Sequence, residues 1–183
     1  FVASKPLQVF QADLFNMKSK AEGDEYSIAL GCVDVFSKVA SVVAIPNKQQ
    51  DSLIEGLKQF FKLMGKPRVL MTGEEGGLQS KTASDYLKKE GISYVVNRNH
   101  CVCIERFIRT YLNMTTRRLQ KRPEEHWYNL IYEILLTYNR KMVSSVTGFT
   151  QNQATKPEHR SEVKQNLEEK AKHGKSYEPI KEG

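Results

Sequence analysis

The chain has 183 residues and a formal net charge of +7, from 28 lysines and arginines against 21 aspartates and glutamates. This length suits one domain with its own hydrophobic core, and the 39% of hydrophobic residues argues against a disordered protein. No apolar run approaches the ~20 residues of a membrane-spanning helix, and no signal-peptide pattern opens the chain, so we expect no membrane partner. The basic charge favours an anionic partner, although many proteins without one share it. The three cysteines lack disulfide spacing, which predicts an intracellular protein.

The first half of the chain has the pattern of a mixed sheet. Three β-rich runs are joined by tight turns and predict consecutive antiparallel strands at residues 7–17, 26–36 and 39–45. The apolar period then changes to three and four, and we expect a helix at 49–64, a strand at 68–71, a helix at 80–90 and a strand at 93–96. The fold class predicted is therefore α/β, with a mixed five-stranded sheet flanked by helices.

The second half of the chain is predicted to be helical. One long helix covers residues 102–121, and Pro123 opens another that continues to about Arg140. Residues 162–172 form a surface helix in this prediction. We expect residues 5–165 to form the folded core and residues 166–183 to form a charged, flexible tail. The chain begins at Phe1 rather than at a methionine, and we expect it to be part of a longer protein.

Two acids far apart in the sequence are candidates for one site. Glu105 lies at the start of the long basic helix, directly after a short polar loop. A carboxylate there can hold a divalent cation while arginines hold nucleic-acid phosphates. Asp13 lies inside an apolar strand, where an ionised carboxylate needs a partner. It is either a strand-end acid that faces solvent or pairs with a lysine, or a ligand of a metal shared with Glu105. Two such acids can hold one magnesium weakly, whereas two ions require a third acid.

The order of these residues resembles the catalytic core of retroviral and retrotransposon integrases, which has an RNase H-like fold. The matching features are an Asp on the first strand and the helix sequence Ile104-Glu105-Arg106-Phe107-Ile108-Arg109-Thr110, followed by a Trp127-containing helix that ends in Tyr138-Asn139. Within this family the sequence resembles the integrases of Polinton (Maverick) elements, through residues 33–38, 145–150 and 152–154. The resemblance covers approximately Pro6 to Val163.

The resemblance implies a polynucleotidyl transferase that processes the ends of element DNA and joins them to a target. Asp13 and Glu105 would be ligands of magnesium or manganese (Mg2+ or Mn2+). DNA is the implied partner, the implied assembly is a homo-oligomer, and the implied location in a eukaryotic host is the nucleus. The implied DNA-binding residues are Arg98, His100, Arg106, Arg109, Arg117 and Arg118. A solvated helix face also explains such a run of arginines, and Arg109 could pair with Glu105 one turn back.

One position departs from the family pattern. The family's second acid belongs to a Thr-Asp-x-Gly-x-Glu-Phe-like motif, and this chain has Thr72-Gly73-Glu74 there. Glycine offers a metal no side-chain oxygen, so we expect impaired catalysis. Glu74 is either a replacement third ligand or part of a solvated acidic loop. The alternative function is an inactive, domesticated or decayed module that binds DNA or a protein partner without chemistry.

An RNase H-type nuclease fits less well, because the Arg-Phe-x-Arg-Thr helix and the Trp127-containing helix are typical of integrases. Asp34 lies on a different strand from Asp13, and we expect it to stabilise a turn rather than to bind a metal.

Overall fold

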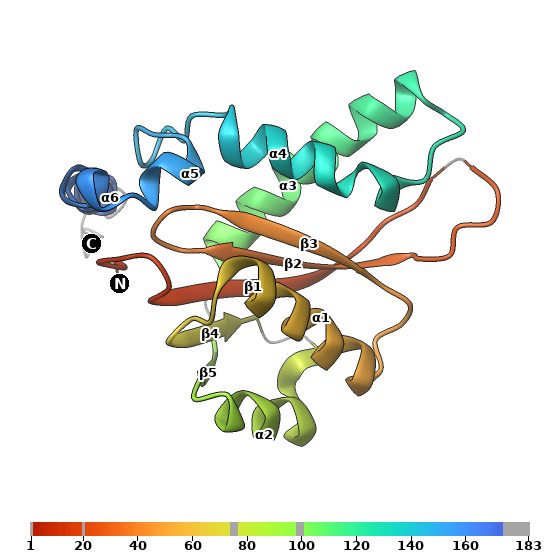
Figure 1. Cartoon of the computed structure of the whole chain (residues 1–183), viewed down its shortest axis with the longest axis horizontal. Coiled ribbons are helices and arrows are strands. Elements are labelled where there is room, and N and C mark those ends of the chain that lie inside the picture. The colour runs from red at the N-terminus through yellow and green to blue at the C-terminus, as the bar shows by residue number, and fades with distance from the viewer. Residues whose placement is uncertain (1, 20, 74–76, 98–100, 174–183) are drawn as a thin grey trace, which may run out of the picture.

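A mixed five-stranded sheet forms the centre of the molecule (Figure 1). The computed structural model describes residues 2–19, 21–73, 77–97 and 101–173. Three strands are antiparallel and consecutive, and the last two run parallel to the first: β1 (Val9–Asn16), β2 (Ile28–Asp34), β3 (Ala40–Ile45), β4 (Val69–Thr72) and β5 (Ser93–Val96). Their order in the sheet is β3-β2-β1-β4-β5. The predicted fold class is confirmed.

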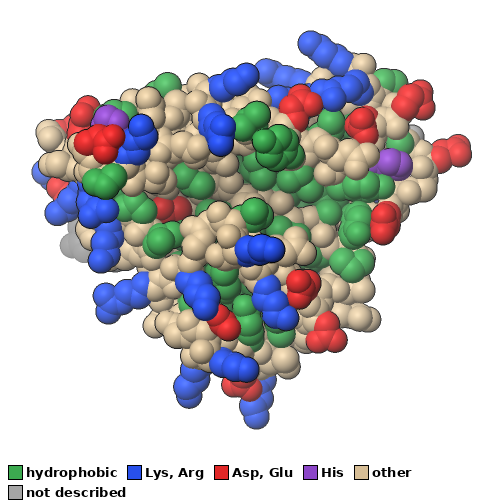
Figure 2. Space-filling view, in the orientation of Figure 1, with side chains coloured by type: hydrophobic (Ala, Val, Ile, Leu, Met, Phe, Trp, Pro, Cys, Tyr) green, Lys and Arg blue, Asp and Glu red, His purple; other side chains and the backbone are tan. Residues whose placement is uncertain are grey.

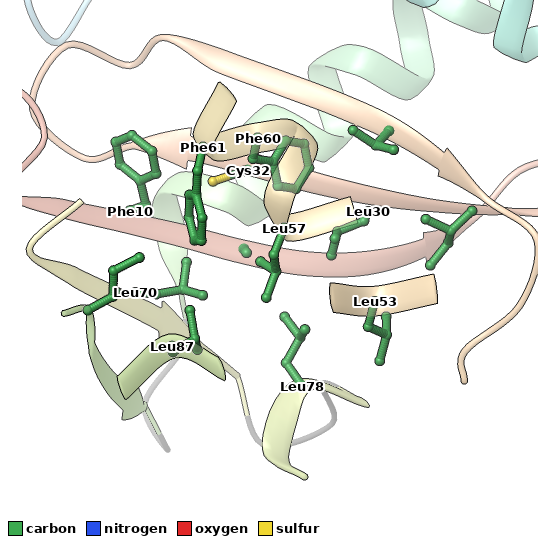
Figure 3. Packing of buried hydrophobic residues seen from close by; sticks show 14 residues of the cluster. Phe10, Leu30, Cys32, Leu53, Leu57, Phe60, Phe61, Leu70, Leu78 and Leu87 are labelled. Atoms are coloured by element: carbon green, nitrogen blue, oxygen red, sulfur yellow. The ribbon is translucent and has the colours of Figure 1, made fainter. Parts of the chain in front are cut away.

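One face of the sheet is covered by α1 (Gln50–Met64) and α2 (Lys81–Lys89) (Figure 1). Successive side chains of a strand point to opposite faces, so Phe10 and Ala12 of β1 both point to this side. They pack in one buried cluster with Leu57 and Phe60 of α1 and with Leu87 of α2 (Figure 3). A short 3₁₀ turn at Gly77–Gln79 adds the buried Leu78 to the same cluster.

The opposite face is covered by α3 (Val102–Lys121) and α4 (Ile131–Arg140). The limits of α3 agree with the predicted helix. Ile104, Phe107 and Tyr111 of α3 form one buried cluster with Ala29 and Val33 of β2, and the cluster also contains residues of α4. Gln11 and Asp13 alternate with Phe10 and Ala12 along β1, so they belong to this second face.

The predicted start of a helix at Pro123 is wrong. A 3₁₀ turn at Trp127–Leu130 precedes α4, which begins only at Ile131. Trp127, the first residue of that turn, is held by contacts with the β1–β2 connection. The Trp127 amide donates to Ser19 Oγ at 2.8 Å and its indole donates to the Tyr26 carbonyl at 2.8 Å. Burial of the indole therefore fixes the path of this segment more strongly than the local helix signal does.

The last elements form a smaller layer beside the sheet: α5 (Gln151–Ala154), a 3₁₀ turn at Pro157–His159 and α6 (Arg160–His173). A buried cluster joins Val163 and Leu167 of α6 to Ala3 and Phe36. The helix therefore continues past residue 165, the predicted end of the core, and Leu167 anchors its second half. Residues 174–183 lie outside the described part, and the tail stays a prediction there.

Asp34 is buried, and its carboxylate accepts from Ser37 Oγ at 2.7 Å and from the Phe36 amide at 3.2 Å. The predicted turn-stabilising role is confirmed, and burial raises the pKa of the Asp34 carboxyl in spite of these hydrogen bonds.

In the described ranges no helix has the length and apolarity needed to cross a membrane.

The side chain of Asn139 attaches α4 to the outer strand of the sheet, and its removal tests that attachment. Its Oδ1 accepts from the Ala40 amide at 3.0 Å, and its Nδ2 donates to the Ala40 carbonyl at 2.9 Å. Asn139→Ala leaves both buried backbone groups without these partners, so we expect the free energy of unfolding to fall by about 1–3 kcal/mol in urea titrations. Asn129→Ala removes an exposed hydrogen bond to Glu125 and should change it by less than about 0.5 kcal/mol. Equal effects of the two substitutions would contradict this attachment.

Candidate active site at the start of α3

The buried side chain of Gln11 fixes the N-terminus of α3 to strand β1. Its Oε1 accepts from the backbone amides of Cys103 at 3.0 Å and Ile104 at 3.2 Å. The first amides of a helix have no partner within the helix, and the N-cap residue Cys101 supplies no side-chain cap. Gln11 therefore caps α3 from a neighbouring strand. The sequence analysis missed this residue; the available signal was a polar residue two positions before Asp13 in an apolar strand.

Glu105 lies in the first turn of α3. The preceding residue, Ile104, packs over Gly31, where an added Cβ would lie 3.4 Å from Ile104 Cδ1. Gly31 is the register partner of Asp13 in the β1–β2 pair. The first turn of α3 thus lies across the two strands at the position of Asp13.

The charges of both acids affect the pKa of the Cys101 thiol. Burial raises its pKa to about 11, and the negative charges of Asp13 and Glu105 add to this effect. Both carboxylates must therefore lie near the same sulfur atom for their charges to act on it. Both predicted site residues therefore lie on the α3 side of the sheet, within electrostatic range of Cys101.

Gly73 leaves the sheet beside Asp13. The parallel register pairs Ala12 with Thr72, the last residue of β4, so Gly73 follows at the level of Asp13, which lies inside β1. A Cβ built on Gly73 would meet no atom of the described residues within 4 Å. The Gly73 carbonyl accepts from Gln79 Nε2 at 3.3 Å, which holds the backbone there. A longer side chain at this position would extend into open space next to Asp13.

The donors in the described part of this site suit a divalent cation but are few. Carboxylate oxygens are the ligands that magnesium prefers, and Asp13 and Glu105 supply them. In the described ranges, no cluster of three or more His, Cys, Asp or Glu side chains could hold a metal ion. Two acids fit one magnesium that keeps several waters, but not a pair of ions. Glu74, Arg98 and His100, three of the predicted site residues, lie outside the described residues.

The arginines of α3 have different surroundings. Arg106, Arg109 and Arg117 are exposed. Arg118 donates from Nε to Glu133 Oε1 at 2.7 Å, and Arg122 Nη2 lies 2.8 Å from Glu133 Oε2. The hydrogen bonds from Arg122 and Arg118 lower the pKa of the Glu133 carboxyl. Arg118 is therefore already paired within the protein.

Figure 2 shows further Lys and Arg side chains along the upper edge of the molecule, where Figure 1 places the later turns of α3. A basic edge of this kind attracts polyanions without reading their sequence.

Comparison with known proteins identifies relatives of the chain. No protein-family model matches it. The chain is 28% identical over 142 residues to the retrovirus-related Pol polyprotein from transposon 297 of Drosophila melanogaster, and 26% identical over 151 residues to that from transposon opus of the same species. These matches cover 76% and 80% of the chain. The chain spans only 13% and 14% of the two polyproteins.

Solved structures share the fold. The catalytic core domain of the HTLV-2 integrase in complex with magnesium, in its trimeric form, is 22% identical with a TM-score of 0.72 over 83% of this chain and 98% of that one. An intasome of simian T-cell lymphotropic virus in complex with PP2A regulatory subunit B56 gamma is 18% identical, with a TM-score of 0.77 over 85% of this chain and 56% of that one. The mixed sheet with its helices is therefore the RNase H-like fold of an integrase core. The chain is thus similar in sequence to a part of two transposon Pol polyproteins and shares its fold with solved integrase cores.

Proposed function

We propose that the chain is an integrase-type polynucleotidyl transferase core of a mobile element, with an acid set left incomplete by Gly73. The observation that supports the proposal is that Gly73 follows β4 at the level of Asp13, while the charges of Asp13 and Glu105 both act on the Cys101 thiol. The reaction class is the attack of a hydroxyl on a DNA phosphodiester, without a covalent enzyme intermediate.

In the proposed reaction the residues of the site have separate roles. Asp13 and Glu105 hold a magnesium or manganese ion which, when bound, neutralises charge on the phosphate and activates the attacking hydroxyl. Gln11 keeps the first turn of α3, and with it Glu105, in place against β1. Gly73 contributes no oxygen, so the ion has fewer protein ligands than in a site with three acids. Slow or absent chemistry is the expected consequence.

DNA is the proposed substrate, and the exposed arginines of α3 are proposed to hold its phosphates. Arg109 and Arg117 are the stronger candidates, because Arg118 is paired with Glu133. Dimeric and trimeric forms of the HTLV-2 core have been solved, which supports a homo-oligomer here. The closer resemblance to Polinton elements and a nuclear location in a eukaryotic host rest on the sequence alone.

The Gly73→Asp substitution tests the incomplete acid set. We expect it to raise magnesium- or manganese-dependent joining of a DNA 3′ end to a target duplex at least about tenfold, or about 1.4 kcal/mol in the barrier, because a third carboxylate strengthens metal binding. Gly73→Asn is the matched control, with nearly the same shape and no charge. If the unmodified protein joins ends as well as the Asp variant does, the site is not impaired. If the Asp variant stays inactive while the protein still binds DNA, a binding module without chemistry is the better description.

Removal of the Gln11 cap tests how Glu105 is positioned. Gln11→Met keeps the approximate volume but loses the oxygen that accepts from Cys103 and Ile104. In the Gly73→Asp background we expect the manganese concentration for half-maximal thermal stabilisation to rise, and joining to slow roughly tenfold, because small displacements of a ligand are costly. Gln120→Met, at an exposed position near the end of α3, is the control. An unchanged manganese midpoint in the Gln11 variant would show that this cap does not set the position of Glu105.

The salt dependence of DNA binding tests the arginines. For Arg109→Gln and for Arg117→Gln we expect weaker binding to duplex DNA and a salt slope smaller by about 0.9, the value for one lost phosphate contact. Lys58→Gln on α1, which is exposed and pairs with Glu55, should leave the slope unchanged. Fluorescence anisotropy across a salt series measures both quantities. A slope that stays constant in both arginine variants argues against phosphate contacts on this side of α3.

A further inference from the structure

A cavity lies beside the first turns of α3, separate from the pair of acids. Its volume is about 690 Å³, within the range of small-molecule sites. The α3 residues in its wall are Val102, Cys103, Arg106, Phe107 and Thr110. These residues follow one face of the helix, and Glu105 and Arg109 are not among them. The other walls come from the β2–β3 connection, the segment after α4, and α6.

The lining of this cavity is apolar and carries charge of one sign only. Valines, Phe107, Met142 and Leu167 supply most of the wall. Among the described residues, the charged ones that line it are Lys38, Arg106 and Lys170, and none of the lining residues is an acid. Glu169 borders a smaller neighbouring cavity of about 350 Å³ instead. An apolar wall with cations alone favours a ligand that has an apolar body and a negative charge.

The three cations are not neutralised by the protein around them. Within the described residues, no ion pair joins any of them to a carboxylate. Lys38 Nζ donates to the Val35 carbonyl at 2.6 Å and lies 3.3 Å from Cys103 Sγ, which holds the ammonium at the wall. The nearby acid Asp34 directs its carboxylate to Ser37 and Phe36 instead. An anion that enters therefore meets charges that no carboxylate already occupies.

We propose that this cavity binds a small amphipathic carboxylate of medium chain length. The aliphatic body packs against the valines and Phe107, and the carboxylate lies among Arg106, Lys170 and Lys38. The cavity is separate from the proposed metal site, because neither Asp13 nor Glu105 lines it.

The cysteines provide a readout of occupancy at this site. Cys32 and Cys101 are buried, whereas Cys103 is partly exposed and lines the cavity. Alkylation of Cys103 by iodoacetamide, measured by mass spectrometry of the peptide that contains it, therefore reports whether the cavity is filled. This readout requires no enzymatic activity.

The test compares decanoate with decylammonium and 1-decanol, which share its chain but not its charge. Decanoate should protect Cys103 from alkylation in a saturable manner, decanol should require roughly three to ten times more, and decylammonium should not protect. Arg106→Gln and Lys170→Gln should each raise the decanoate midpoint roughly three- to tenfold and leave the decanol midpoint unchanged. Arg109→Gln, on the same helix but outside the cavity, is the matched control.

Each opposite outcome overturns the proposal. Equal protection by all three compounds would show an apolar cavity without selection for an anion. Decanoate protection that both cavity variants leave unchanged would remove the assigned role of the cations. An absence of protection by decanoate at any concentration below its micelle threshold would show that the cavity does not take this ligand.

Discussion

The capping of α3 by Gln11 is the contact on which the geometry of the candidate site depends. The Oε1 atom of Gln11, buried between the sheet and α3, accepts hydrogen bonds from two backbone amides that have no partner within the helix. Each of these amides would cost about 1–3 kcal/mol if left unsatisfied in the core. The contact therefore fixes where α3 begins along β1. Glu105 follows one residue later, so its backbone position is set by the same hydrogen bonds that stabilise the fold.

The register of the sheet sets the other side of the site. A one-residue shift of β1 would turn Gln11 and Asp13 toward α1 and bring Phe10 and Ala12 to the α3 face. The buried cluster of Phe10 and Ala12 under α1 prevents this shift, since both residues are fully buried there. Hydrophobic packing on one face thus holds two polar residues on the other. Their position is a consequence of the packing of the core.

Gly73 has no evident structural reason to be glycine. A Cβ at Gly31 would lie 3.1 Å from Phe15 Cε1, and one at Gly56 would lie 2.9 Å from Leu30 Cδ2, so these two glycines allow close packing. In the described part of the chain, a Cβ built on Gly73 has no atom within 4 Å, and Gly73 is not among the glycines with positive φ. Neither packing nor backbone conformation requires it. Its effect is therefore on the chemistry of the site, through the carboxylate that it does not supply.

The elements that sequence patterns predicted well are those whose stability is local or whose apolar period is regular. The first strand and the long helix were predicted with limits close to those of β1 and α3. The start of α4 was missed because Trp127 is held by Ser19 and Tyr26, about a hundred residues earlier. The role of Gln11 depends on a partner 92 residues away, which no local pattern contains. The pairing of Arg118 with Glu133 likewise joins two different helices.

The helical period explains how α3 serves two separate regions. Consecutive residues of a helix point about 100° apart, so Glu105 and Arg106 diverge although they are adjacent in sequence. Glu105 belongs to the side near Asp13, and Arg106 belongs to the cavity wall. A ligand in the cavity could influence Glu105 only by moving the first turn of α3. Because Gln11 holds that turn to β1 by two buried hydrogen bonds, such a movement would have to break them, and the two regions should therefore bind their ligands independently.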